Sequence, residues 1–390
     1  MRFDVVAIGR YKTAPDALTM SGPKPEEDEV RGDLLAEADK LLMHALTVDR
    51  RLSAADATKV VALGGMRAGE AQQHGLVDEI AELDIAQPDT RRAHTADDLL
   101  DKPRTTWGTP NTVAIVPVVG TIVRDDGDNP LPGESASAKR IVKELEDAGN
   151  DPSVIGVVLR VDSGGGEVFA SELIHRAVKA VQRKKPIVAS MADTAASGGY
   201  YIVAPCDAIY AEPNTVTGSI GIFQLKVDLA GFFDLTEIKA YTYKTGPLAD
   251  WRATTHGFTD DERARLNQIL SEEYDAFLAK VAEGRHMTVD AVRSIAEGHV
   301  YTGRRAKELG LVDELGGLAD AVEAVKARAR VQGEVALQVP KTVFSLSKAV
   351  LGGASAAVNP LEHITALKGR LMRWEREPLA LLPQTFEVRP

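Results

Sequence analysis

Residues 192–222 read ADTAASGGYYIVAPCDAIYAEPNTVTGSIGI, and this stretch decides the fold that we expect for the chain. Its small residues, Ala195–Gly199, follow an apolar run typical of a buried strand and precede a segment that can continue as a helix. A strand that turns directly into a helix leaves backbone N–H groups unpaired at the helix start, where they can bind an anion. Ser197 lies in this turn, so its hydroxyl is a candidate nucleophile for acyl transfer. A capping serine in an ordinary glycine-rich turn is the alternative.

The composition excludes several classes of protein. The 390 residues exceed one typical domain, and 44% hydrophobic with 26% charged residues is the balance of a soluble globular protein. A net charge of -11 argues against a nucleic-acid binder, because phosphate binding needs a clustered basic face. The single cysteine, Cys206, excludes an internal disulfide framework. We expect no secretory signal and no transmembrane segment, since the longest apolar run, 112–123, is too short to span a bilayer.

The pattern after residue 111 predicts a mostly parallel sheet covered by helices. Short continuous apolar segments alternate there with amphipathic segments, which is typical of α/β proteins. We expect strands at 113–123, 154–161, 187–191 and 208–211, and helices at 137–148 and 168–183. Thr259–Glu262 has the pattern of a capping box at the start of a long helix.

A partial internal repeat indicates the domain organisation. Tyr11–Pro15 (YKTAP) recurs as Tyr243–Pro247 (YKTGP), and Gly75–Glu79 (GLVDE) recurs as Gly310–Glu314. The first copy thus matches only the back half of the second, either because its front is missing or because a half-repeat is the natural form. The expected parts are a half-repeat at 1–83, a linker at 84–110, a complete repeat at 111–332 and a C-terminal tail at 333–390.

A second glycine-rich turn, Gly164–Gly166, follows a neighbouring strand of the same predicted sheet. Because the ends of parallel strands place their loops side by side, an N–H of Gly165 or Gly166 and the N–H of Gly198 can point at one oxygen. Such a pair of donors beside the hydroxyl of Ser197 would form an oxyanion hole. Each glycine cluster by itself indicates only a tight turn.

The hydroxyl of Ser197 needs a base, and the sequence offers two kinds. None of the eight histidines lies in a comparable loop; the nearest candidates, which surface or core packing also explains, are His175, His256 and His299. A lysine can serve if burial lowers its pKa by several units from about 10.4. Lys12 and Lys244 both follow an apolar segment and a tyrosine, which favours partial burial. A solvated surface lysine is the usual alternative.

Three long motifs make the chain recognisable. They are LRVDSGGGEVFASE (Leu159–Glu172), DTAASGGYYIVAP (Asp193–Pro205) and NTVTGSIGIF (Asn214–Phe223). In this order they resemble the signal peptide peptidase A (SppA, protease IV) family of serine–lysine peptidases, over about Phe3 to Val331. The resemblance implies an α/β fold of the ClpP/crotonase type, a βαβ superhelix with one complete repeat and a truncated preceding repeat.

The resemblance also implies roles for residues of this chain. In the long, two-repeat form of the family, the nucleophile maps onto Ser197 and the lysine base onto Lys12, within Gly9–Ala14 (GRYKTA). In the short form one repeat supplies both groups and adjacent subunits complete each site, which leaves Lys244 as the alternative base. The sequence departs from the family at Gly164, where proline is usual, and we expect that it lacks the front of the first repeat and the N-terminal membrane anchor of the family.

The function implied is cleavage of short apolar peptides, such as signal peptides left after secretion, without a metal or other cofactor. The resemblance further implies a homo-oligomer, a tetramer or larger ring, and an association with the membrane on its extracytoplasmic side. Two alternatives stay open at this point. An inactive remnant or scaffold fits the incomplete first repeat, and a crotonase-type acyl-CoA enzyme would use the same N–H donors without needing a serine or lysine.

Overall fold

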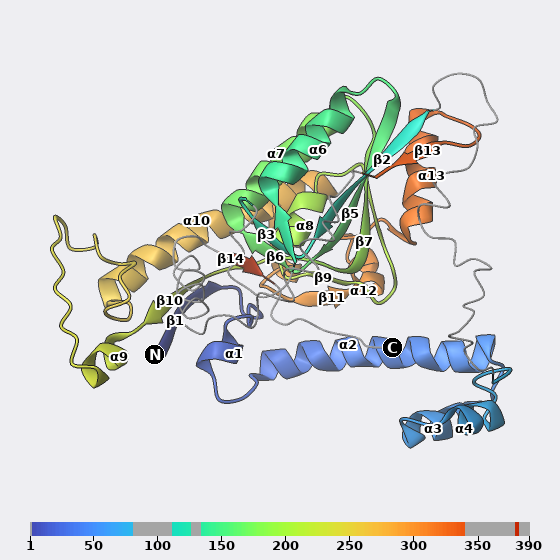
Figure 1. Cartoon of the computed structure of the whole chain (residues 1–390), viewed down its shortest axis with the longest axis horizontal. Coiled ribbons are helices and arrows are strands. Elements are labelled where there is room, and N and C mark those ends of the chain that lie inside the picture. Colours follow the sequence, from blue (N-terminus) through green and yellow to red (C-terminus); the bar gives the residue numbers. More distant parts are fainter. Residues whose placement is uncertain (1, 81–110, 126–133, 340–378, 382–390) are drawn as a thin grey trace, which may run out of the picture. The chain divides into compact units, whose positions relative to one another are not determined.

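The computed structural model describes residues 2–80, 111–125, 134–339 and 379–381 (Figure 1). The chain divides into two compact units, one made of Met1–Val30 with Thr109–Pro390 and the other of Arg31–Gly108. The predicted linker and most of the predicted tail lie outside the described residues. Among the residues described, no helix combines the length and the apolar character needed to cross a membrane.

The larger unit is built on a mostly parallel sheet. Its centre consists of β2 (Thr112–Val119), β5 (Val154–Ser163) and β7 (Ile187–Ala196), which pair in parallel. The flanking strands are β8 (Ala208–Ala211), β9 (Val216–Gly218), β11 (Val300–Thr302), β12 (Glu314–Leu315) and β13 (Ala336–Gln338). The structure is therefore α/β, as the alternating apolar segments predict.

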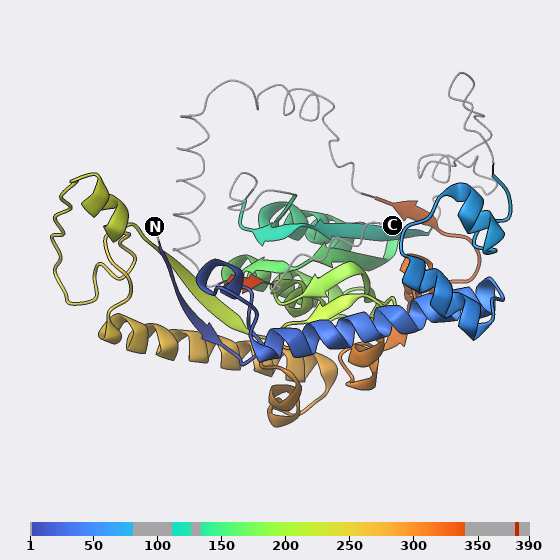
Figure 2. The ribbon, with the colours of Figure 1, turned by 90° about the horizontal axis from the view of Figure 1, so that it is seen from below.

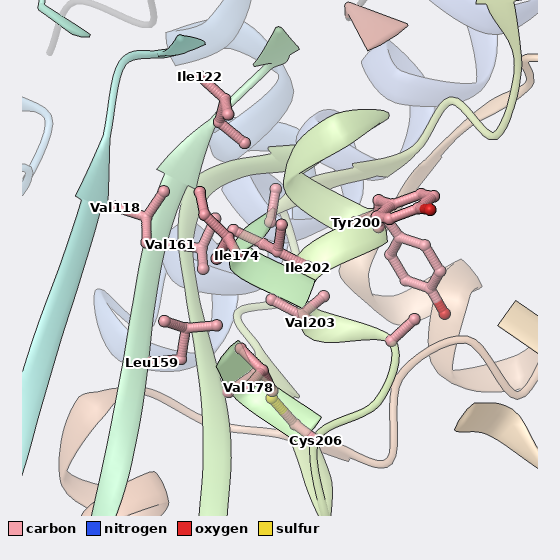
Figure 3. Packing of buried hydrophobic residues seen from close by; sticks show 14 of the residues in the cluster. Val118, Ile122, Leu159, Val161, Ile174, Val178, Tyr200, Ile202, Val203 and Cys206 are labelled. Carbon is pink, nitrogen blue, oxygen red and sulfur yellow. The ribbon is translucent and has the colours of Figure 1, made fainter. Parts of the chain in front are cut away.

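Helices cover both faces of this sheet, which explains why its central strands are apolar throughout. On one face lie α6 (Ala138–Asn150) and α7 (Val168–Gln182), and on the other lies α13 (Leu318–Ala329) (Figure 1). Figure 3 shows Leu159 and Val161 of β5 facing α7 and the short helix α8 (Gly198–Val203). This core fixes the ends of β5 and β7, from which the two glycine-rich turns emerge.

A second sheet of the same unit brings distant parts of the chain together. Its order is β1 (Arg2–Ile8), β10 (Ile222–Asp228), β14 (Leu379–Leu381), β6 (Gly165–Glu167), β3 (Thr121–Val123) and β4 (Ser135–Ser137). β1 and β10 pair antiparallel along their whole length, from Arg2 opposite Asp228 to Ile8 opposite Ile222 (Figure 2). The N-terminal strand is thereby fixed beside the complete α/β domain.

The remaining elements of the larger unit are helical and mostly short. They are α1 (Asp16–Thr19), α9 (Ala230–Leu235), α10 (Asp260–Arg285), α11 (Val289–Ile295) and α12 (Gly303–Glu308). The predicted capping box begins α10: Thr259 Oγ1 accepts from the N–H of Glu262, whose carboxylate accepts from the N–H of Thr259. Leu266, Leu270 and Phe277 of α10 pack into the main core.

The smaller unit is helical within the described residues. It contains most of α2 (Pro25–His44), a π-helical turn at Ala45–Asp49, α3 (Ala54–Leu63) and α4 (Ala68–Gln73). Its core contains Leu46, Ala57 and Val60.

One ion-pair arrangement occurs once in each unit. Arg50 donates to the carbonyl of Gly75 and to both carboxylate oxygens of Asp78. Arg285 makes the same three contacts with Gly310 and Asp313. These residues belong to the matching GLVD segments of the sequence repeat. The repeated sequence thus forms the same local structure twice.

Candidate active site

Ser197 lies at the sharp turn between β7 and α8. Its φ of 54° and ψ of -116° are strained for a residue other than glycine, and its side chain is fully buried. The turn is held by two backbone hydrogen bonds, from the N–H of Ser197 to Gly218 and from the N–H of Tyr201 to Ser197, both 2.8 Å long.

The glycines that follow Ser197 are required by close packing. A Cβ on Gly198 would lie 2.7 Å from the hydroxyl oxygen of Ser171, and one on Gly199 would lie 2.5 Å from the carbonyl oxygen of Ser163. Only glycine lets the turn approach these neighbours. The small residues of the AASGG segment are therefore what allows a hydroxyl to stand at the start of a helix.

Lys12 meets Ser197 from the other end of the sequence. It follows β1, is 3% exposed, and its Nζ lies 2.7 Å from the Oγ of Ser197. The same Nζ donates to the hydroxyl of Ser219 at 3.0 Å and to its carbonyl at 3.1 Å. All three contacts are to uncharged oxygens.

Burial gives the Lys12 amine unusual acid–base properties. Removal from water lowers the pKa of Lys12 well below its ordinary value, because the charged ammonium form loses its hydration. Within the described parts of the chain, none of its hydrogen bonds is to a carboxylate that would favour the ammonium. A neutral amine next to a serine hydroxyl can accept the hydroxyl proton.

The loop Glu297–His299 fixes the turn that carries Lys12. The N–H of Tyr11 donates to the carbonyl of Glu297 at 2.7 Å, and the N–H of Ser219 donates to the carbonyl of His299 at 2.7 Å. Gly298 has a φ of +77°, and a Cβ there would lie 2.6 Å from the backbone nitrogen of Lys12. This loop therefore holds both the turn that carries Lys12 and the turn that carries Ser219.

The two glycine-rich turns lie side by side. A Cβ on Gly198 would be 3.1 Å from the backbone nitrogen of Gly166, so the two residues are close neighbours. Gly198 is the first residue of α8, where a backbone N–H has no acceptor within the helix. The N–H of Gly165 instead donates to Ser163 Oγ at 3.1 Å. Gly198 and Gly166 are thus neighbours, whereas the N–H of Gly165 already has an acceptor.

Comparisons with known proteins identify the family of the chain. The model of peptidase family S49 matches residues 179–332. A relative from Methanocaldococcus jannaschii, named "Putative protease", is 36% identical over 57% of this chain and 73% of its own length. One from Enterococcus faecium, named "Putative signal peptide peptidase SppA", is 30% identical over 64% of this chain and 73% of its own. The chain belongs to the S49 peptidase family, together with SppA.

Longer S49 relatives are matched over only part of their length. Protease 4 of Salmonella typhi is 32% identical over 82% of this chain, which spans 54% of that protein. The chloroplastic serine protease SPPA of Arabidopsis thaliana is 26% identical over 94% of this chain, which spans 58% of it.

Lys244, His175 and His256 of this S49 chain have other partners, whereas His299 belongs to the loop that holds the turns of Lys12 and Ser219. The amine of Lys244 donates to Asp250 at 2.7 Å and to the carbonyl of Pro247, and 40% of its side chain is exposed. The three histidines contact other groups: His175 the carbonyl of Tyr201, His256 the carboxylate of Asp250, and His299 the ring of Tyr301. Cys206 is buried among apolar residues.

Sequence reasoning missed one member of the site, Ser219. The segment TGSIG signals a tight turn, and Ser219 has a positive φ of 52° there, but nothing local shows that its hydroxyl faces Lys12. The contact becomes visible only when β9 is placed beside β7, which aligns Thr217 with Ala195 and Gly218 with Ala196.

One cluster in the described residues has the residue types of a metal site. Ligand atoms of Asp250, His256 and Glu262 lie within 4.8 Å of one another. However, Lys226 Nζ lies 3.8 Å from the carboxylate of Glu262, and Lys244 pairs with Asp250. These lysines already compensate the carboxylates and oppose a cation, so we interpret the cluster as structural.

Proposed function

We propose that this S49 member is a serine endopeptidase in which Ser197 is the nucleophile and neutral Lys12 is the general base. The observation that carries the proposal is the 2.7 Å approach of the buried amine to the buried hydroxyl. Burial lowers the pKa of Lys12, which keeps the amine in the form that accepts a proton.

The reaction follows from the positions of these groups. Ser197 Oγ bonds to the peptide carbonyl carbon as its proton moves to Lys12 Nζ. The N–H groups of Gly166 and Gly198 would hold the developing oxyanion. The ammonium then gives its proton to the leaving amine, and the C–N bond breaks. Water then attacks the acyl-enzyme carbonyl as Lys12 accepts its proton, the ester C–O bond breaks, and the ammonium returns the proton to Ser197 Oγ. Ser219 would position the amine and accept hydrogen bonds from its charged form.

The substrate class is proposed from the relatives and from the site. The name of the Enterococcus faecium relative refers to signal peptides, which are rich in short apolar segments. We propose short apolar peptides, such as remnant signal peptides, as substrates, and a site of action at the extracytoplasmic face of a membrane. Neither a metal nor another cofactor enters the proposed steps.

The assembly is also a proposal. The paired Arg50 and Arg285 arrangements support a ClpP/crotonase-like superhelix with one complete repeat and the back half of a preceding one. In the second copy, the tyrosines before Lys244 are largely exposed, at 80% for Tyr241 and 95% for Tyr243, whereas β1, before Lys12, pairs with β10. We propose that a neighbouring copy covers this segment in a homo-oligomer, a tetramer or larger ring.

Three alanine variants test the proposed function. We expect Ser197→Ala and Lys12→Ala to abolish cleavage of a fluorogenic apolar peptide, and Lys244→Ala to retain much of it. Loss of activity in Lys244→Ala with retention in Lys12→Ala would overturn the choice of base.

Two further measurements separate the remaining alternatives. A serine-reactive phosphonate should label Ser197; a folded sample that stays unlabelled would instead support an inactive remnant or scaffold. Turnover of a CoA thioester that survives Ser197→Ala, without peptide cleavage, would support an acyl-CoA enzyme.

A further inference from the structure

The start of helix α10 holds strand β1 at Asp4. The carboxylate of Asp4 accepts from the backbone N–H of Phe258 at 2.7 Å and pairs with the guanidinium of Arg263, near the beginning of α10. The same guanidinium donates to the carbonyl of Val5 at 2.9 Å. Figure 2 shows β1, in dark blue, next to α10, in gold. These contacts tie one point of β1 to the helix.

A second charge pair lies beside the first. Lys226 of β10 is opposite Asp4 in the register of the two strands, so both side chains point to the same face. The buried Nζ of Lys226 lies 3.8 Å from the carboxylate of Glu262, the residue before Arg263. Both cations face the ring of Phe258, with Lys226 Nζ 4.9 Å and the Arg263 guanidinium 5.8 Å from its centre. Opposite residues of the two strands therefore bind consecutive residues of one helix.

The apolar residues of β1 do not by themselves fix how it pairs with β10. Val5–Ile8 are apolar without a break, and a shift of the pairing by two residues keeps every side chain on its own face of the sheet. Because a strand rises about 3.4 Å per residue, such a shift would move the turn of Lys12 by roughly 7 Å. The 2.7 Å contact between Lys12 Nζ and Ser197 Oγ would then be lost.

The charged residues of the two strands oppose a shift in either direction. In the observed register, Arg2 lies opposite Asp228 and Asp4 lies opposite Lys226, which are two pairs of opposite charge. A two-residue shift in one direction would place Arg2 opposite Lys226, and a shift in the other would place Asp4 opposite Asp228. Like charges directly opposite each other destabilise a strand pair. The charge pattern therefore selects the observed register.

We propose that Asp4 and Arg263 are positioning residues for the Lys12 amine, because they set the register of β1 against β10. The inference rests on the proposed peptidase function. The loop Glu297–His299 holds the end of β1 near Lys12, and the Asp4–Arg263 pair holds its beginning. In this register Lys12 is 3% exposed, and its burial favours the neutral amine. A displaced amine would be hydrated and would take up a proton.

The pH profile of catalysis tests the positioning role. Because the displaced amine is charged, low pH favours the displaced state and rising pH restores the buried one. We expect Asp4→Ala to move the acid limb of the kcat profile for a fluorogenic apolar peptide upward by about one pH unit. This shift lowers kcat about tenfold at pH values below the limb, with little change in KM. Asp4→Glu, which keeps the charge, should recover most of the loss.

The matched control breaks another ion pair of the same helix. Asp275 of α10 pairs with Arg293 of α11 at 2.8 Å, and Asp275→Ala should leave kcat and its pH profile unchanged. A loss of kcat in Asp4→Ala by the same factor at every pH would indicate general destabilisation and would overturn the positioning role. An unmoved pH profile with unchanged kcat would overturn it as well.

Disulfide cross-linking tests the register without requiring catalysis. The background is the full chain with Cys206→Ala, which removes the native thiol. Ala7→Cys with Phe223→Cys joins opposite residues of the observed register, whose Cα atoms lie roughly 4.5–5.5 Å apart, within the range of a disulfide. Ala7→Cys with Leu225→Cys joins residues that become opposite only after a two-residue shift. On mild oxidation, we expect the first pair to link rapidly and the second slowly.

Reversal of one charge should change these rates. Asp4→Lys places a cation against Arg263, and in the shifted register its charge would lie opposite Asp228. We therefore expect Asp4→Lys to slow the link of the observed register and to speed the link of the shifted one. Rates equal to those of the parent would overturn the proposal. Changed rates in a chain without peptidase activity would leave the register device standing and refute the proposed function. Peptidase activity with unchanged rates would do the opposite.

Discussion

Replacing Lys12 by methionine tests the buried amine directly. Lys12→Met keeps an unbranched side chain of similar length and removes the amine, whose pKa burial lowers well below its ordinary value. Because the folded pKa is depressed, the unfolded chain binds the extra proton between that pKa and about 10.4. The burial of Lys12 therefore lowers the free energy of unfolding most at pH values below the folded pKa, and this penalty decreases as pH rises through that window.

The magnitude follows from one proton. Across the window, the wild-type free energy of unfolding gains up to about 1.4 kcal/mol per pH unit from Lys12, a contribution that methionine lacks. The variant also loses three hydrogen bonds to Ser197 and Ser219, each worth about 1 kcal/mol. This loss and the relief of the burial cost act in opposite directions on the absolute difference between the proteins, so the slope with pH is the quantity to measure.

The assay is urea unfolding of both proteins from about pH 5 to about pH 9, below the ordinary pKa of about 10.4. We expect the stability of Lys12→Met relative to wild type to fall as pH rises. Ser197→Ala is the control, since it keeps the amine and should follow the wild-type pH dependence. A difference between Lys12→Met and wild type that stays flat, or grows with pH, would refute the reasoning. Peptidase activity should fall in Lys12→Met by a factor of about 10² to 10⁴.

Three other substitutions have defined outcomes. Ser219→Ala removes the hydroxyl contact of the Lys12 amine and keeps the contact to the backbone carbonyl, so kcat for a reporter peptide should fall about tenfold to a hundredfold with little change in KM. Gly298→Ala places a methyl group against the backbone of Lys12 and should reduce kcat at least as much. The control Gly231→Ala places its methyl group in open space and should not reduce kcat. Equal activities of the two variants would count against the positioning role of the loop. Lys226→Met leaves the buried carboxylate of Glu262 without this cation and should lower the free energy of unfolding, measured by chemical denaturation, by about 3 kcal/mol. A variant as stable as wild type would show that the ion pair adds no stability.

Local patterns predict much of the larger unit. The strand, turn and helix around Ser197 follow from an apolar run, a cluster of small residues and a second apolar segment. The sequence leaves open one strand or two at 113–123, and the structure has two, divided at Gly120, whose φ is +88° and where a Cβ would lie 2.1 Å from the carbonyl oxygen of Glu134. That close approach depends on a remote segment, so periodicity alone does not reveal it.

The site was less accessible from sequence, because its parts meet through long-range pairing. A lysine after an apolar segment and a tyrosine describes both Lys12 and Lys244, and only the pairing of β1 with β10 brings the first to Ser197. From the sequence alone, the N–H of either Gly165 or Gly166 in the turn at 164–166 could be the oxyanion donor. The bond from Gly165 to Ser163 distinguishes them, and it depends on a side-chain orientation that sequence does not encode.

The position of β1 at the end of its sheet has a consequence for how activity is lost. Terminal strands with a neighbour on one side only tend to detach at lower free energy than the interior of a domain. Detachment of this strand would withdraw the amine while the α/β core stays intact. Under gradual denaturation, inactivation should therefore precede the cooperative melting of the core, and the chain would pass through a folded but catalytically silent state.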